Sequence, residues 1–302
     1  MSAALSIVLA IQEGTHRLDA VVGALAFDLP PGVEVLLVWA ADDAEAGRAA
    51  RALASPERPW LRMEAAPSNS LVPDLWAHGI PRTTAPRVAL TVVHCVPPRG
   101  WIDRLLRADL RTWAALGGPI DQRPGSDDLG WAIYLLRYAG VATESVGSGT
   151  ASFTGVAADN AVYSRAALSA VSNTWEDGFW EPTVHDALRA AGQLIGLDPA
   201  LAVLHDNGYS ARGFVLQRLL HGYRFGRDRA RRHGPLTAGL YAAASPAVPL
   251  LFGRKVVARA LGLREARRHL PGALPWLLVF LAAWSAGEVL GAHAGALRGR
   301  GP

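Results

Sequence analysis

Apolar residues in the first part of the chain come in short continuous runs rather than in alternation with polar ones. Three such runs occur, at residues 5–11, 33–39 and 87–93, and residues 61–65 form a weaker strand between them. Runs of this length are typical of strands that are buried on both faces of a parallel sheet. The segments between these runs have apolar residues at helical spacing, as between residues 18 and 25. The alternation predicts an α/β domain with a Rossmann-type, mostly parallel sheet flanked by helices.

The middle of the chain has a less regular pattern. Helices are expected at residues 101–109, 126–138, 163–171 and 182–191, and further strands at residues 113–118 and 201–204. Residues 214–232 combine helical apolar spacing with many arginines, which predicts a long basic amphipathic helix.

Two uncharged hydrophobic stretches follow, at residues 235–253 and 270–287. A membrane helix needs about 20 apolar residues, and the second stretch approaches that length. The first contains three prolines and has basic residues on both sides, which favours a re-entrant or interfacial segment over a crossing. The alternative is a pair of helices buried in a soluble core. We therefore divide the chain into a domain of residues 1–232 and a hydrophobic membrane-associated region of residues 233–302.

Charge and cysteine content indicate which kind of partner and which cellular compartment to expect for this protein. The net charge is +4, and the basic residues cluster late, beside the apolar stretches. This arrangement favours contact with a membrane surface over a nucleic-acid groove, since no basic stretch carries interleaved aromatic residues. The single cysteine, Cys95, excludes an intrachain disulfide. No basic region precedes the first apolar run, so we expect no signal peptide and a cytoplasmic N-terminal domain.

Acidic residues follow the first two predicted strands. Glu13 comes after the first strand, and Asp42 and Asp43 come after the second. Ligands of open α/β sheets bind at the carboxyl ends of strands, so these acids are candidates for contacts to a ribose or base. The alternative is that they cap helices or lie in solvated turns.

The fourth strand ends without a carboxylate. His94 and Cys95 are the metal-competent residues there, and one His beside one Cys is not a closed metal site. No partner base for Cys95 is evident, so a nucleophilic role is not expected.

Residues 175–182 place three acids among three aromatic residues, just before a predicted helix. Glu181 and His185 are four apart and share a helix face. A carboxylate packed by tryptophan is suited to act as a general base. The alternative is that these acids interact with the dipole of the helix.

Taken in order, residues 6–232 resemble glycosyltransferase family 2, which has the GT-A fold. Residues 6–10 with Gln12 and Glu13 are similar to the opening strand and nucleotide loop of the family. Residues 97–101 match the proline-glycine-tryptophan stretch that follows its metal-binding acids, and residues 160–165 resemble the segment beneath its acceptor site.

The resemblance also implies roles for later residues. Glu181 falls where the family has its catalytic base, and Asn160 falls in the acceptor segment. His205 lies where some members contact a metal or phosphate, and Gln217 and Arg218 resemble part of a phosphate-contacting helix. With Glu13, Asp42 and His94, these residues form the expected substrate-binding set.

The family's Asp-x-Asp motif is degenerate here, because its positions are Val92, Val93 and His94. The cofactor therefore stays open between a divalent cation, Mg²⁺ or Mn²⁺, and none. Arg218 or Arg224 is a candidate replacement for the cation, since guanidinium groups bind phosphate oxygens in bidentate fashion. Any activity would then survive a chelator.

The resemblance implies a membrane-associated glycosyltransferase that moves a sugar from a nucleotide-sugar donor to a lipid-linked or cell-envelope glycan acceptor. Loss of the metal-binding acids favours an alternative, a non-catalytic GT-A-like scaffold that partners an active transferase. A third interpretation is a soluble nucleotide-binding protein whose C-terminal region belongs to its core.

Overall fold

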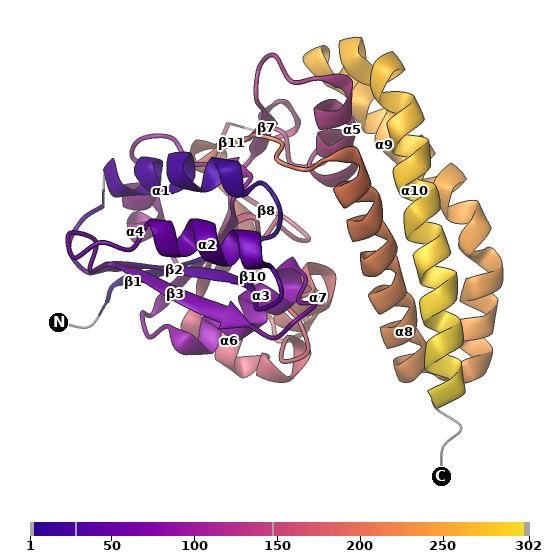
Figure 1. Ribbon diagram of the computed structural model, residues 1–302, viewed down its shortest axis with the longest axis horizontal. Helices are drawn as coiled ribbons and strands as arrows, with labels where there is room; N and C mark the ends of the chain where they lie inside the picture. The colour runs from indigo at the N-terminus through magenta and orange to yellow at the C-terminus, as the bar shows by residue number, and fades with distance from the viewer. Residues whose placement is uncertain (1–2, 28, 147, 299–302) are drawn as a thin grey trace. The chain divides into compact units, whose positions relative to one another are not determined.

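The computed structural model describes residues 3–27, 29–146 and 148–298, and the chain forms two compact units (Figure 1). The sheet unit consists of Met1–Arg123 and Val141–Gly208, and the helical unit consists of Pro124–Gly140 and Tyr209–Pro302. Each unit has its own core.

The sheet unit is built on an eight-stranded sheet with the order β3-β2-β1-β4-β9-β6-β10-β8. Its strands are β1 Leu5–Ile11, β2 Val33–Ala40, β3 Leu61–Ala66, β4 Arg87–Val92, β6 Trp113–Gly117, β8 Ala151–Ser152, β9 Asn160–Ser164 and β10 Leu194–Leu197. β3, β2, β1 and β4 are parallel, β9 is antiparallel to β4 and β6, and β10 is parallel to β6. Every residue of β1 is buried, as expected for a strand covered on both faces. The predicted α/β class with a mostly parallel sheet is confirmed.

The connecting helices follow the apolar spacing of the sequence. They are α1 Leu18–Phe27, α2 Ala44–Ala52, α3 Val72–Gly79, α4 Trp101–Arg107, α6 Arg165–Ala170 and α7 Glu181–Ala190. In α1, the side chains of Leu18, Val21, Val22 and Leu25 are all buried. Helical spacing therefore puts one apolar face on the core.

A small second sheet joins three distant parts of the sheet unit. β11 Val203–His205 lies between β5 Cys95–Val96, to which it is antiparallel, and β7 Ile120–Gln122, to which it is parallel. His205 pairs with Cys95 on one side and with Gln122 on the other. The turn after β4 and the ends of β7 and β11 are thereby held together.

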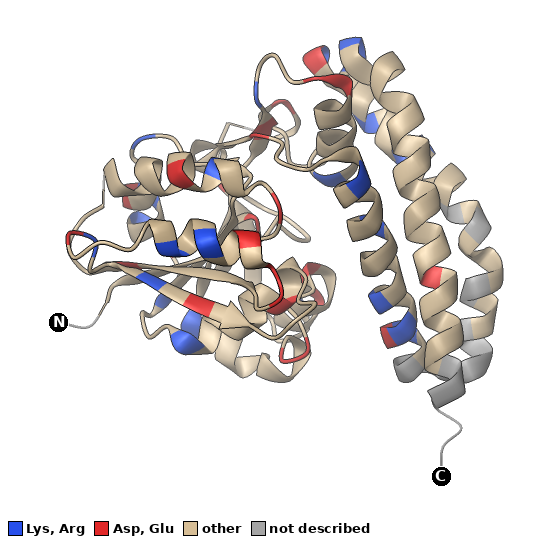
Figure 2. Cartoon of the chain, in the orientation of Figure 1, with Lys and Arg blue, Asp and Glu red and all other residues tan. Residues whose placement is uncertain are grey.

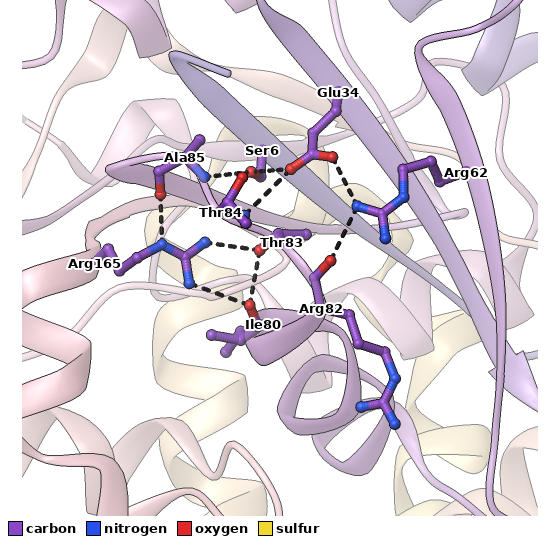
Figure 3. Close-up of polar contacts among 9 residues, drawn as sticks. All are labelled: Ser6, Glu34, Arg62, Ile80, Arg82, Thr83, Thr84, Ala85 and Arg165. Atoms are coloured by element: carbon purple, nitrogen blue, oxygen red, sulfur yellow. Dashed lines mark hydrogen bonds and ion pairs between the residues drawn. The ribbon is translucent and has the colours of Figure 1, made fainter. Parts of the chain in front are cut away.

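A polar network ties the amino ends of the parallel strands together (Figure 3). Glu34 of β2 accepts hydrogen bonds from Ser6 of β1 at 2.6 Å and from Arg62 of β3 at 2.9 Å. Burial raises the pKa of Glu34, but hydrogen bonds from Ser6, Arg62 and the backbone of Thr84 outweigh it and leave the pKa below the ordinary value. Arg165 donates to carbonyl oxygens of the segment that leads into β4. This edge is structural, which leaves the opposite edge for ligands.

The helical unit contains α5 Asp128–Arg137, α8 Ala211–Ala244, α9 Val248–Gly262 and α10 Arg264–Arg298. α8 and α10 run parallel and pack closely through glycines (Figure 1). A Cβ atom on Gly222 would lie 2.0 Å from the carbonyl oxygen of Trp284, and one on Gly287 would lie 2.0 Å from that of Leu219. The backbones approach this closely because these positions lack side chains.

One carboxylate is buried between helices of this unit. Glu288 of α10 is 2 % exposed; it accepts from Arg229 at 2.5 Å and from Ser245 at 2.9 Å. Both partners come from the α8 segment and the turn that follows it. The charge of Glu288 is thus neutralised inside the unit, consistent with the rule that buried charges are paired.

α10 is the one helix among the described residues that is long and apolar enough to cross a membrane, over Arg264–Gly295. Of the apolar 18-residue stretch of this helix, 39 % is buried, whereas a helix in the core of a soluble protein would be mostly buried. Figure 2 shows frequent basic residues along α8, whereas α10 is charged in its first turns and has no charged residue from 269 to 287. Leu274, Leu278 and Leu290 of α10 are exposed.

One local expectation was wrong. Tyr163, expected in a helix, lies in β9, and the helix begins at Arg165. Residues 235–253 continue α8 to Ala244 and enter α9 after one turn, and their expected re-entrant or interfacial position stays a prediction. The predicted division at residue 232 stays a prediction, although α8 runs through that point without a break; residues 299–302 of the predicted C-terminal region lie outside the described residues.

Candidate functional site

Three of the predicted substrate-binding residues follow strands that end at one edge of the sheet. β1 is parallel to β2 and to β4, and its Ala10 pairs with Val38 and with Val92. Glu13, Asp42 and His94 come shortly after those strand ends. The carboxyl ends of neighbouring parallel strands are the usual ligand site of such a sheet.

The backbone at this edge is strained. Among the described residues, Glu13 and Asn69 are the non-glycine residues with positive φ, at 56° and 60°. They follow β1 and β3, and the backbone N–H of Asn69 donates to Asp42 Oδ1 at 2.9 Å. Asp43, by contrast, caps α2 through Ala46. Strained non-glycine residues cluster at binding sites, which supports this edge as the functional one.

His94 is buried at the centre of this edge. Its Nε2 donates to the carbonyl oxygen of Gln12 at 3.1 Å. Gly14 and Gly208 pack against its ring, and a Cβ atom on Gly14 would lie 2.5 Å from His94 Cε1. Gly14 also has a φ of 66°, which favours glycine. The imidazole thus fills the space between the loops that follow β1 and β11.

His205 occupies the next position along this edge. Its Nδ1 donates to Gln122 Oε1 at 2.8 Å, and its ring centroid is 6.4 Å from that of His94. Both histidines are buried. The structure therefore brings together His94 and His205, which are 111 positions apart.

Sequence reasoning missed an ionic cluster beside these histidines. The carboxylate of Asp206 contacts Arg17 Nη1 at 3.0 Å and also Arg123. The backbone N–H of Asp206 donates to the carbonyl oxygen of His94 at 2.8 Å, and that of Arg123 donates to His205 at 3.0 Å. The sequence signal for Arg17 is its position four residues after Glu13, in the loop that follows β1. Arg123 and Asp206 come together through the pairing of β7 with β11, which no local sequence pattern reveals.

Asn160 lies deep in the same unit. Its amide donates to the carbonyl oxygens of Pro119 and Leu201, and its Oδ1 accepts from Trp101 Nε1 at 3.0 Å. The side chain is 1 % exposed. These bonds join three segments of the unit, so its packing role is clear and its part in substrate binding stays a prediction.

Glu181 begins α7 and reaches the start of β9. Its Oε1 accepts from the backbone N–H of Ala158 at 2.6 Å. Asn160, which is two residues after Ala158, pairs with Thr91 near the end of β4. Glu181 therefore lies at the edge of the sheet where β4 ends. His94 follows Thr91 by three residues. The two proposed reactive regions thus lie along one rim of the sheet.

Gln217 and Arg218 lie on α8 in the helical unit. Gln217 is buried, and its Oε1 accepts from Arg218 Nε at 2.8 Å. The Arg218 guanidinium lies over the Phe214 ring at 5.0 Å. Their predicted contact with substrate stays a prediction.

The residues present do not fit a divalent cation. Val92 and Val93, where the resemblance led us to expect metal-binding carboxylates, are buried apolar side chains. Among the described residues, no group of three or more His, Cys, Asp or Glu side chains is placed to hold a metal. Divalent metals need such convergent ligands, so no step is assigned to one.

A polar pocket of about 510 Å³ lies along α4 of the sheet unit. Its charged lining residues are Arg99, Asp103, Arg104, Arg107, Asp109 and Asp198. Asp103 pairs with Arg107 at 3.1 Å, and Asp109 and Asp198 accept backbone N–H bonds. Opposite charges therefore balance across this pocket.

Comparison with known proteins supports the fold. No protein-family model and no curated protein matches the sequence. A solved structure, mannosyltransferase PcManGT from Pyrobaculum calidifontis in complex with GDP-Man and Mn²⁺, matches over 95 % of this chain and 87 % of its own, with a TM-score of 0.55. At 15 % identity the likeness shows the fold alone. The predicted GT-A-like fold with a hydrophobic helical tail is confirmed.

Proposed function

We propose that this chain is a glycosyltransferase of the family 2 type, which moves a sugar from a nucleotide-sugar donor to a membrane-proximal acceptor. The observation that carries the proposal is the GT-A-like fold, with Glu13, Asp42, His94 and Glu181 along one edge of its sheet. Fold alone does not establish an activity, so the proposal depends on this edge.

The proposed donor site follows from the strand ends. Glu13 and Asp42 contact the nucleoside, and His94 and His205 lie beside the diphosphate. Asn160, Gln217 and Arg218 complete the set that the family resemblance implies. The similar structure was solved with GDP-Man, so GDP-mannose is the first donor to test.

Glu181 is the proposed general base. It takes the proton from the acceptor hydroxyl, whose oxygen then forms a bond to the anomeric carbon of the sugar. The bond between that carbon and the diphosphate breaks, and the nucleoside diphosphate leaves with the electron pair. The N–H of Ala158 holds the carboxylate in position for this step.

The acceptor is proposed to be lipid-linked or part of a cell-envelope glycan. The support is α10, which has the length and composition of a membrane helix and an exposed apolar face. A membrane-bound helical unit with a cytoplasmic sheet unit would hold the transfer site near such acceptors.

Replacing Glu181 with Gln tests the base directly. We expect Glu181→Gln to lower transfer by about 10²-fold or more, because a positioned base contributes about 10²–10⁴-fold, while donor affinity stays within about twofold. Transfer of radiolabelled sugar and calorimetric titration of the donor measure the two effects. Glu176→Gln, a change in the loop before α7, is the matched control. Undiminished transfer by Glu181→Gln would exclude it as the base.

The second candidate is a non-catalytic GT-A-like scaffold that partners an active transferase. Val92 and Val93 at the carboxylate positions favour it. The scaffold predicts no binding of any GDP-, UDP- or dTDP-sugar by the purified chain, whereas a transferase binds at least one.

A further inference from the structure

We propose that Arg17 and Arg123 bind the donor's diphosphate and supply the positive charge that a divalent cation supplies elsewhere. This inference rests on the proposed transferase function, since it names the groups that hold the leaving group. It assigns a site to two residues that the family resemblance does not mark.

The location of the pair is the first argument. Arg17 follows the strained loop after β1, and Arg123 follows β7. Both contact Asp206, whose backbone is bonded to the carbonyl oxygen of His94. His94 stands at the last position of the degenerate Asp-x-Asp motif. The two guanidinium groups are therefore anchored to the turn that follows β4.

The local charge is the second argument. The guanidinium groups of Arg17 and Arg123 both contact the carboxylate of Asp206. The Asp206 side chain is 8 % exposed, whereas those of Arg17 and Arg123 are 34 % and 55 % exposed. The carboxylate is thus buried beneath two cations that reach solvent, and an anion approaching from solvent meets the cations first.

The donor capacity of Arg17 is the third argument. Its Nη1 contacts Asp206, but its buried Nε has no hydrogen-bond partner in the described part of the chain. A guanidinium presents five N–H donors in a planar fork that matches phosphate oxygens. Buried donors in folded proteins are almost always satisfied, so an unsatisfied Nε points to a ligand or an ordered water.

Two glycines hold the loops that follow β1 and β11 close together beside His94. Gly14 and Gly208 bring the loops after β1 and β11 into direct contact, and a Cβ atom on Gly208 would lie 2.6 Å from Gly14 Cα. Side chains at either position would push these loops apart.

Calorimetric titration of the full-length protein in EDTA tests the proposal, with GDP and UDP as probes and the bare nucleosides as references. We expect a nucleoside diphosphate to bind without metal. Arg17→Met and Arg123→Met should each weaken that binding about tenfold or more, and leave nucleoside binding within about twofold.

Arg62→Met is the matched control, because Arg62 also pairs with a partly buried carboxylate but lies at the opposite edge of the sheet. It should leave diphosphate binding unchanged. Arg17→Lys and Arg123→Lys keep the charge without the fork, and should bind with intermediate affinity. If the Met variants fail to fold, the Lys variants and the wild-type preference for diphosphate over nucleoside decide the question.

The outcomes separate this inference from the proposed function. Diphosphate binding that disappears in EDTA and returns with Mn²⁺, or that equals nucleoside binding, would overturn the arginine site and leave the transferase standing. The same holds if the Arg17 and Arg123 variants bind as tightly as the wild type. If the wild type binds no nucleotide or nucleotide sugar under either condition, the proposed function falls, and this inference falls with it.

Discussion

His185 shows how burial sets the chemistry of a single residue beside the proposed base. It lies one turn after Glu181 in α7, and its Nε2 is hydrogen-bonded to the hydroxyl of Tyr163 at 3.0 Å. Burial and, to a smaller extent, the charge of Arg189 lower the pKa of His185 to about 4, against the opposing effect of Asp186. Burial also raises the pKa of the Tyr163 hydroxyl, and nearby Glu181 and Asp159 add to the effect. Both groups are therefore neutral near pH 7.

The histidine makes stability depend on pH. Its folded pKa lies below the ordinary value of 6.5, so the neutral form stabilises the fold fully above pH 6.5, and this stability is lost as the pH falls toward 4. The loss approaches about 3 kcal/mol at the low end of that window. Denaturant unfolding at pH 7 and pH 5 should show a smaller loss in His185→Gln than in the wild type. Equal losses in the wild type and in His185→Gln would contradict the assignment.

The placement of residues was only partly predictable. Glu13, Asp42 and His94 were placed at one edge because each follows a recognisable buried strand. Asp206 and Arg123 were not, because their approach depends on β5, β7 and β11, which have two or three residues each. Such short strands carry no periodicity, and their pairing is decided by tertiary contacts.

At the scale of elements, long buried runs predicted strands well and short mixed segments did not. β1, β2 and β4 were expected within one residue of their observed bounds. The apolar spacing of Tyr163, Ala167 and Leu168 predicts a helix from Tyr163, but the helix begins at Arg165 and Tyr163 lies in β9. Pairing with β4 and β6 on its two sides overrides that local signal.

The glycine contacts between α8 and α10 give the helical unit a sharp test. Gly287→Ala should destabilise the protein by about 1–3 kcal/mol, because the new Cβ would overlap the backbone of Leu219. Gly239→Ala, on α8 with nothing nearby, should instead stabilise by up to about 1 kcal/mol through helix propensity. Denaturant unfolding monitored by circular dichroism measures both changes. Equal effects of the two substitutions would contradict the close packing.

The apolar face of α10 gives a test of membrane association. Combined Leu274→Glu, Leu278→Glu and Leu290→Glu substitutions should strongly reduce sedimentation with vesicles of phosphatidylcholine and phosphatidylglycerol, because they place charges on the exposed apolar face. Leu194→Glu, at a similarly exposed position of the sheet unit, should have little effect. Unchanged sedimentation of the triple variant would argue that α10 is not the membrane contact.

At the scale of the whole molecule, the α/β core and the apolar helical tail follow from hydrophobic patterning. The division into units was less accessible, since residues 124–140 fold with the C-terminal helices. α5 contributes Trp131, which stacks on His269 of α10 at 4.6 Å. A segment that leaves one unit for another and returns has no signature in composition or period, because its contacts are entirely non-local.

The central claim is that the carboxyl edge of the sheet binds a nucleotide sugar. Determining the structure of the full-length protein with GDP-mannose, and with other nucleotide sugars if that donor does not bind, tests this claim most directly. We predict the nucleoside beside Asp42 and Glu13, and the diphosphate beside Arg17 and His94. A nucleotide bound elsewhere, or an unoccupied edge at saturating concentrations of every donor, would contradict the account.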